Sequence, residues 1–170
     1  LARLGYFAEK LRRDYGISIS SAILTDTPGY TWAVPMVLRG SGIRYLSVGT
    51  NDIWIPFHSK TDLPPLFYWQ GPDGSEVLLW VTFVYAHAEW IGLHHSYESL
   101  LTNIPLYLEK FWAREDYPYD TILLHGGYGD NYRPWYRVEP GVCDIIRRWN
   151  ERWAYPRIIL STNSEFFQEM

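Results

Sequence analysis

The stretch Ser21-Ala-Ile-Leu-Thr-Asp-Thr-Pro-Gly-Tyr-Thr-Trp32 joins an apolar run to a Pro-Gly turn through a single acid, Asp26. The pattern predicts a buried strand over residues 17–24, followed after the turn by a helix over residues 32–39 with Pro35 in its first turn. In α/β proteins ligands bind at the carboxyl ends of parallel strands, where this strand would deliver Asp26. Asp26 is therefore a candidate functional residue, although an Asp before a Pro-Gly turn is also ordinary turn chemistry.

The alternation of strands and helices continues along the chain. Further strands are predicted over residues 43–48, 121–124 and 157–160. Further helices are predicted over residues 1–15, 96–114 and 140–153, and after the capping-box pair Thr162 and Glu165. Gly-Pro-Asp-Gly-Ser (71–75) separates two more strand patterns and predicts an inserted hairpin. This order predicts an α/β fold with a mainly parallel sheet, either part of a β/α barrel or an open doubly wound sheet.

Composition favours one domain over residues 1–170 and excludes several classes of partner. The chain has 15 Lys and Arg against 19 Asp and Glu, and its formal net charge is −4. Because the basic residues are scattered, we expect no nucleic-acid partner. No apolar run approaches the roughly 18 residues of a membrane span, so we expect no membrane partner.

Aromatic residues make up 18% of the chain, and many of them fall in the loops between predicted elements. Flat rings offer apolar faces to sugar C–H groups, so these loops indicate either carbohydrate binding or ordinary packing. The candidate rings are those of Trp54, Tyr85 and Trp90. His87, which lies between Tyr85 and Trp90, is a candidate substrate contact. His125 ends the predicted strand 121–124, where a core histidine bonded to backbone is the simpler interpretation.

Two acids follow predicted parallel strands and would lie at the same edge of the sheet. Asp26 and Asp130 together meet the needs of glycoside hydrolysis, in which one carboxylate is the nucleophile and the other the acid/base. A retaining mechanism requires a separation of roughly 5–5.5 Å between them. Asp130 also lies in a Gly-Asp-Asn sequence that is typical of a turn.

Several segments occur in an order that is similar to one known family. They are residues 14–16, 26–31, 42–46, 67–78, 129–133 and 161–167. The most specific is 67–78, Phe-Tyr-Trp-Gln-Gly-Pro-Asp-Gly-Ser-Glu-Val-Leu, which resembles a Trp-x-Gly-x-Asp-Gly-Ser-x-Val-Leu hairpin. Along nearly its whole length the chain resembles the N-terminal catalytic domain of family 38 glycoside hydrolases, the α-mannosidases, as a divergent member or a fragment.

The resemblance implies a seven-stranded, metal-dependent β/α barrel, of which this chain would be the C-terminal portion. It implies that Asp26 is both the nucleophile and a zinc ligand, and that Asp130 is the acid/base. One alignment instead places Asn131 at the acid/base position, where an amide could not donate and recover a proton. Asn131, Tyr132 and Arg133 would contact substrate. The family's other zinc ligands have no counterpart here, so we expect the rest of a parent chain to supply them and to complete the barrel.

Three functions remain open at this point. The resemblance favours retaining, zinc-assisted hydrolysis of α-linked, mannoside-like glycosides. A non-catalytic carbohydrate-binding module would keep the aromatic cleft without the second acid. A metal-dependent carbohydrate deacetylase on a related barrel would release acetate instead of sugar.

Overall fold

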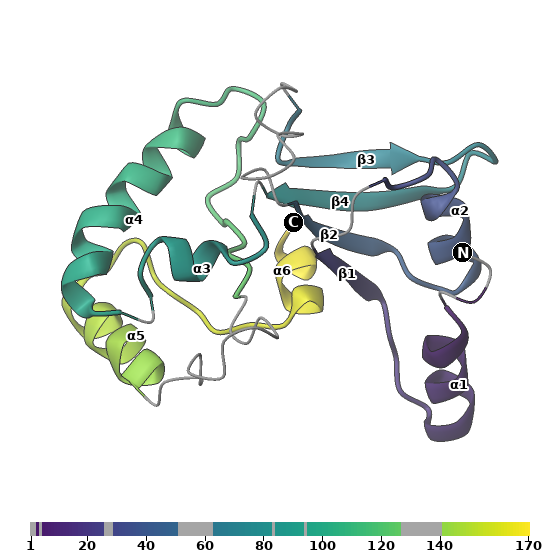
Figure 1. Ribbon diagram of the computed structural model, residues 1–170, viewed down its shortest axis with the longest axis horizontal. Coiled ribbons are helices and arrows are strands. Elements are labelled where there is room, and N and C mark those ends of the chain that lie inside the picture. The colour runs from purple at the N-terminus through teal and green to yellow at the C-terminus, as the bar shows by residue number, and fades with distance from the viewer. Residues whose placement is uncertain are drawn as a thin grey trace.

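One mixed sheet organises the protein in the computed structural model, which describes residues 3, 5–25, 29–50, 63–82, 84–93, 95–126 and 141–170 (Figure 1). Its strands are β1 (Ser21–Thr25), β2 (Tyr45–Gly49), β3 (Leu66–Gln70) and β4 (Glu76–Thr82), in the spatial order β1-β2-β4-β3. β1, β2 and β4 are parallel, and β3 pairs antiparallel with β4. The α/β class, the mainly parallel sheet and the inserted hairpin are confirmed. The seven-stranded barrel remains a prediction.

The parallel strands end at the same level. Thr25 of β1 pairs with Gly49 of β2, and Gly49 pairs with Thr82 of β4. Because these residues are the last of their strands, the three carboxyl ends meet at one edge of the sheet. Segments that follow β1, β2 and β4 therefore all leave from that edge.

Six helices accompany the sheet in the described part of the chain. They are α1 (Tyr6–Tyr15), α2 (Val34–Gly40), α3 (His87–Trp90), α4 (Tyr97–Trp112), α5 (Gly141–Arg152) and α6 (Asn163–Glu169). Pro35 lies in the first turn of α2, as predicted. The capping box of Thr162 and Glu165 begins α6, also as predicted. The short helix α3 was not predicted, because its four residues carry no helical repeat.

The two faces of the sheet have different cores. Alternation along β2 turns Leu46 and Val48 to one face, where they pack with Val34 and Leu38 of α2. On the other face Trp80 is fully buried, stacks on Phe111 of α4 and meets Phe166 of α6 edge to face. α2 and α6 thus cover opposite faces. Burial of a large ring such as Trp80 is among the strongest single contributions that a core residue makes.

A third cluster joins α3, α4 and α5, which Figure 1 shows grouped beyond the carboxyl ends of the parallel strands. Trp149 of α5 packs against Tyr97 of α4, and its Nε1 donates to the carbonyl of Pro156 at 2.7 Å.

None of the described helices combines the length and the hydropathy that a membrane crossing requires.

The strands predicted over 121–124 and 157–160 are wrong: both segments are irregular. In each, side chains bond the backbone where a strand neighbour would. Asn150 donates to the carbonyl of Ile158 at 2.7 Å and accepts from its N–H at 2.9 Å, while the hydroxyl of Tyr117 donates to the carbonyl of Thr121. Their apolar residues nevertheless enter the cores, since Ile122, Leu124 and Ile158 pack against the helical cluster.

Candidate functional site

Buried polar side chains gather at the carboxyl edge of the sheet. Among the described residues, the buried polar ones are Ser47, Thr50, Thr82, His87 and His125. All but Ser47 lie at or just beyond the carboxyl ends of β2 and β4 or pack against them. Burying a polar group costs free energy unless it is hydrogen-bonded, so such groups concentrate where function requires them. This edge is therefore the candidate functional site.

Thr50, which directly follows β2, hydrogen-bonds the end of β4 and the segment after it. Its N–H and its hydroxyl both donate to the carbonyl of Thr82, at 3.0 and 2.9 Å. Its own carbonyl accepts from the N–H of Tyr85 at 3.1 Å. These bonds hold Tyr85, a predicted substrate contact, at the end of β2.

Gly49 allows this close approach. A Cβ at Gly49 would lie 2.5 Å from the Cα of Tyr85 and 2.8 Å from the Nδ1 of His125. Both distances are shorter than a carbon atom can tolerate without displacing its neighbours. The strand end, Tyr85 and the His125 ring thus meet only because residue 49 has no side chain.

His125 is 4% exposed, and its carbonyl accepts from the N–H of Ala88 in α3 at 2.9 Å. Neither ring nitrogen has a hydrogen-bond partner among the described residues. Burial lowers the pKa of His125 from its usual 6.5 to about 4, so the ring is uncharged at neutral pH. The prediction of a core histidine is confirmed, but the ring does not bond the backbone of any described residue, as it was predicted to do.

His87 is 2% exposed and its ring is engaged. Its Nδ1 lies 2.8 Å from the hydroxyl oxygen of Thr82 and 3.2 Å from that of Tyr107. The Tyr107 ring meets it edge to face at 4.3 Å between centroids. Burial raises the pKa of Tyr107, which keeps its hydroxyl protonated and able to donate. This network orients His87 at the edge where β4 ends.

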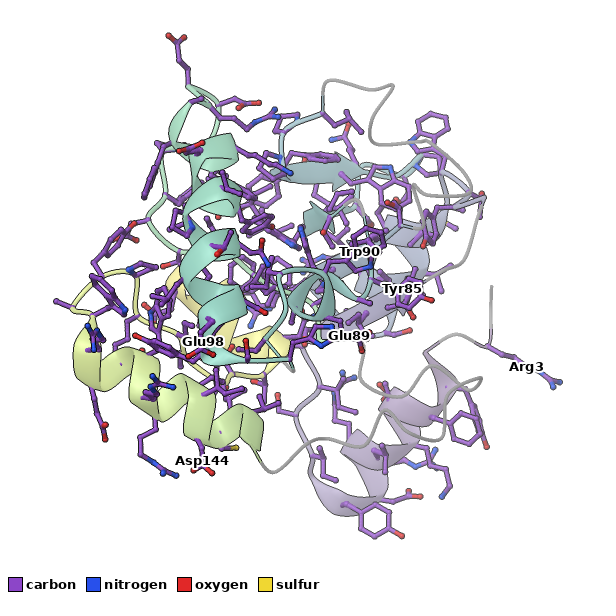
Figure 2. The ribbon with its side chains drawn as sticks, turned by 60° about the vertical axis from the view of Figure 1, so that its left-hand side comes forward. Arg3, Tyr85, Glu89, Trp90, Glu98 and Asp144 are labelled. Atoms are coloured by element: carbon purple, nitrogen blue, oxygen red, sulfur yellow. The ribbon has the colours of Figure 1, made fainter. Side chains whose placement is uncertain are left out.

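The structure brings together only part of the predicted site. Tyr85, which precedes α3, is half-buried, and Trp90 at the end of α3 is 57% exposed. Figure 2 shows both near Glu89 of α3. With His87 they lie at the carboxyl edge. The remaining predicted residues lie outside the described part of the chain: Asp26, Trp54, Asp130, Asn131, Tyr132 and Arg133.

Metal donors do not cluster in the described ranges. No group of three or more His, Cys, Asp or Glu side chains there is placed to hold a metal ion. Structural and catalytic zinc sites take three or four protein ligands. The described residues therefore do not fit zinc by themselves, and Asp26, the one ligand predicted from the sequence, is not among them.

Compared with protein-family models, residues 4–170 match the family described as "Glycosyl hydrolases family 38 N-terminal domain". The chain belongs to this family. The resemblance found in the motifs is thus confirmed. Membership in family 38 indicates glycoside hydrolysis and a carbohydrate substrate. Among curated proteins, no match to this family 38 chain was found.

The sequence did not predict Thr50 or Thr82 as site residues. It also did not predict that the ring nitrogens of His125 lack a hydrogen-bond partner among the described residues. Threonine is common in strands, so neither threonine carries a distinguishing pattern. For His125 one signal was present: a polar ring at the end of an apolar run, directly before Gly126 and Gly127. The close approach to Gly49 depends on residues far apart in the sequence, and no local pattern encodes it.

Proposed function

We propose that the protein hydrolyses an α-linked, mannoside-like glycoside with retention of configuration at the carboxyl edge of β1, β2 and β4. The observation that carries the proposal is the shared register of Thr25, Gly49 and Thr82. Asp26 follows Thr25 directly in the sequence, so the proposed nucleophile comes straight after the strand that ends at this edge. Family 38 membership and the buried polar groups support the same location.

In the proposed reaction the Asp26 carboxylate attacks the anomeric carbon while the Asp130 carboxyl protonates the leaving oxygen. The bond to the leaving group breaks and a glycosyl ester forms on Asp26. Asp130, now a carboxylate, then takes a proton from water, which attacks the same carbon and releases the sugar and the Asp26 carboxylate. Two displacements restore the original configuration.

Substrate contacts complete the proposal. Trp54, Tyr85 and Trp90 would line the sugar pocket with their rings. The polar contacts would come from His87, Asn131, Tyr132 and Arg133. Two of the described residues are held at this edge, since Thr50 bonds the backbone of Tyr85 and the Tyr107 hydroxyl bonds His87, which supports the proposal.

We propose zinc as a cofactor because of the family resemblance, and we propose Asp26 as its ligand in this chain. No step of the reaction above passes through it. We propose that other parts of a parent protein contribute the further ligands that a zinc site needs.

Replacement of the nucleophile tests the proposal. With a panel of aryl α-glycosides, Asp26→Asn should reduce hydrolysis to the background rate, because an amide does not form the glycosyl ester. Asp144→Asn is the matched control, as Asp144 is an exposed acid on α5 paired with Arg147. Full activity in a folded Asp26→Asn protein would overturn the proposal.

Asn131 supports a second candidate, a carbohydrate-binding module without catalysis. It takes the acid/base position in one alignment, and an amide cannot exchange the required proton. This candidate predicts saturable binding of glycosides without turnover by either the unmodified protein or Asp26→Asn. Turnover of any glycoside that depends on Asp26 would exclude it.

A further inference from the structure

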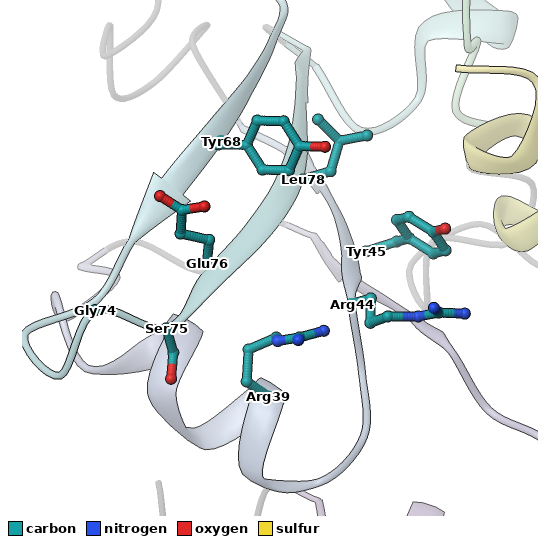
Figure 3. Close-up of a pocket in the computed structure, with 8 residues that line it drawn as sticks. All are labelled: Arg39, Arg44, Tyr45, Tyr68, Gly74, Ser75, Glu76 and Leu78. Carbon is teal, nitrogen blue, oxygen red and sulfur yellow. The ribbon is translucent and has the colours of Figure 1, made fainter.

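A hollow of about 440 Å³ lies at the opposite end of the sheet from the candidate site (Figure 3). Tyr45 and Glu76, which begin β2 and β4, both line it, whereas the candidate site lies where these strands finish. Small-molecule sites have volumes of roughly 300–1,000 Å³, so the hollow has the size of a ligand pocket.

Its floor is a part of the sheet that α6 leaves open. Phe167 of α6 stacks on Tyr45 at 5.0 Å, and Phe166 covers Trp80, but the covering helix does not bury Tyr68, which is 68% exposed on β3. Leu78 beside it is half-buried. An aromatic face and an aliphatic side chain therefore border the hollow, as in pockets that hold the apolar faces of sugars.

Two arginine residues border the same hollow. Arg39 comes from the last turn of α2 and Arg44 from the residue before β2. Figure 3 shows both along one side of the hollow, with Tyr68 and Glu76 along the other. Neither arginine forms an ion pair with a described carboxylate, in contrast to Arg12, Arg13, Arg114, Arg147 and Arg148.

The surroundings favour an anion. The Arg44 guanidinium lies 5.6 Å from the centre of the Tyr45 ring, a cation–π distance, and Tyr45 itself lines the hollow. Among the described residues of the lining Glu76 is the one acid, and its Oε1 accepts from the Nε2 of Gln70 at 3.1 Å. Two cations against one acid leave a net positive charge in a chain whose overall charge is −4.

We propose that this hollow is a second binding site, which takes a sugar that carries an oxyanion such as a phosphate, sulfate or carboxylate group. Arg39 and Arg44 bind the oxyanion, since guanidinium groups form strong charge-assisted bonds to such groups. The Tyr68 ring packs against the sugar. The choice of a sugar as the ligand rests on membership in family 38. The site itself is separate from the proposed reaction at Asp26.

Calorimetric titration of the full chain with mannose 6-phosphate at low ionic strength tests the proposal. Saturable binding is expected, at least about tenfold tighter than binding of methyl α-mannoside, which has no anion. Mannose 6-sulfate and glucuronic acid as further probes show which oxyanion the hollow prefers. Absence of saturable binding for all three anionic sugars would overturn the proposal, as would equal affinity for inorganic phosphate.

Variants locate the site. Arg39→Gln combined with Arg44→Gln should weaken binding of the preferred anionic sugar by about tenfold or more, and Tyr68→Ala should weaken it while affinity for inorganic phosphate is unchanged. The control is Arg157→Gln, because Arg157 is exposed and outside the hollow. Unchanged affinity in the double variant would overturn the proposal. In the unmodified protein, ligand-induced shifts of the Tyr68, Ser75 and Glu76 amide resonances give a readout that needs no substitution. Asp26→Asn should leave this binding intact, which separates it from the hydrolytic site.

Discussion

The Nδ1 atom of His125 lies against Gly49 so closely that a Cβ on Gly49 would meet it at 2.8 Å. Gly49 is the last residue of β2, and His125 is bonded through its carbonyl to Ala88 of α3. This contact joins the carboxyl edge of the sheet to the helical cluster beyond it. The most buried part of the candidate site therefore depends on a residue without a side chain.

Gly49→Ala should destabilise the fold by about 1–3 kcal/mol, because the new methyl group meets the Tyr85 backbone at 2.5 Å and cannot be accommodated by a side-chain rotation. Urea denaturation measures the change. Gly141→Ala is the control: among the described residues, no atom outside its chain neighbours and its own helix backbone lies within 4 Å of a Cβ there, and α5 begins at this residue. The control should be neutral or slightly stabilising. Equal stability of Gly49→Ala and the unmodified protein would contradict the close contact.

The free energy of unfolding should decrease as the pH is lowered, because His125 becomes protonated more readily in the unfolded chain than in the folded one. Its pKa is about 4 in the folded protein and near 6.5 when unfolded, so between these values the unfolded chain binds more protons. The contribution of the buried, uncharged ring is fully present above pH 6.5 and is lost progressively as the pH falls toward 4. The difference corresponds to about 3 kcal/mol.

Urea denaturation at a series of pH values checks this prediction, with His125→Leu as the comparison. The leucine variant should lose less stability between pH 7 and pH 4.5, because it has no imidazole to protonate. Parallel pH profiles for the two proteins would contradict the account of His125.

Asn150→Ala should cost about 2 kcal/mol, because the Asn150 amide bonds both the N–H and the carbonyl of Ile158 and both would lose their partner. Thermal unfolding measures the loss. Glu151→Ala, an exposed neighbour on α5, should change stability by less than about 0.5 kcal/mol. Similar melting temperatures for the two variants would show that Asn150 does not hold the segment.

Local patterns predicted the elements whose signals lie within a few residues. The Gly-Pro-Asp-Gly-Ser turn gave the β3–β4 hairpin, and the Thr162–Glu165 capping box gave the start of α6. Pro35 likewise marked the first turn of α2. In each case a short sequence carries its own hydrogen-bonding or backbone preference.

Contacts between distant residues could not be predicted in this way. Residues 121–124 have the composition of a strand, but a strand forms only where a neighbour offers its backbone, and here the Tyr117 hydroxyl bonds the segment instead. The burial of His125 beside Gly49 brings together residues more than 70 positions apart in the sequence. The proposed catalytic pair, Asp26 and Asp130, was predicted from its place after apolar runs and from family motifs, and it lies outside the described residues.

The central claim is that glycoside hydrolysis proceeds through an ester on Asp26. Incubation of the full chain with a 5-fluoro-mannosyl fluoride, followed by peptide mass spectrometry, tests it directly, since the fluorine slows breakdown of the glycosyl ester. The account predicts one sugar label on the peptide that contains Asp26, and no label in Asp26→Asn. A label on another residue, or turnover of aryl mannosides without any label, would contradict it.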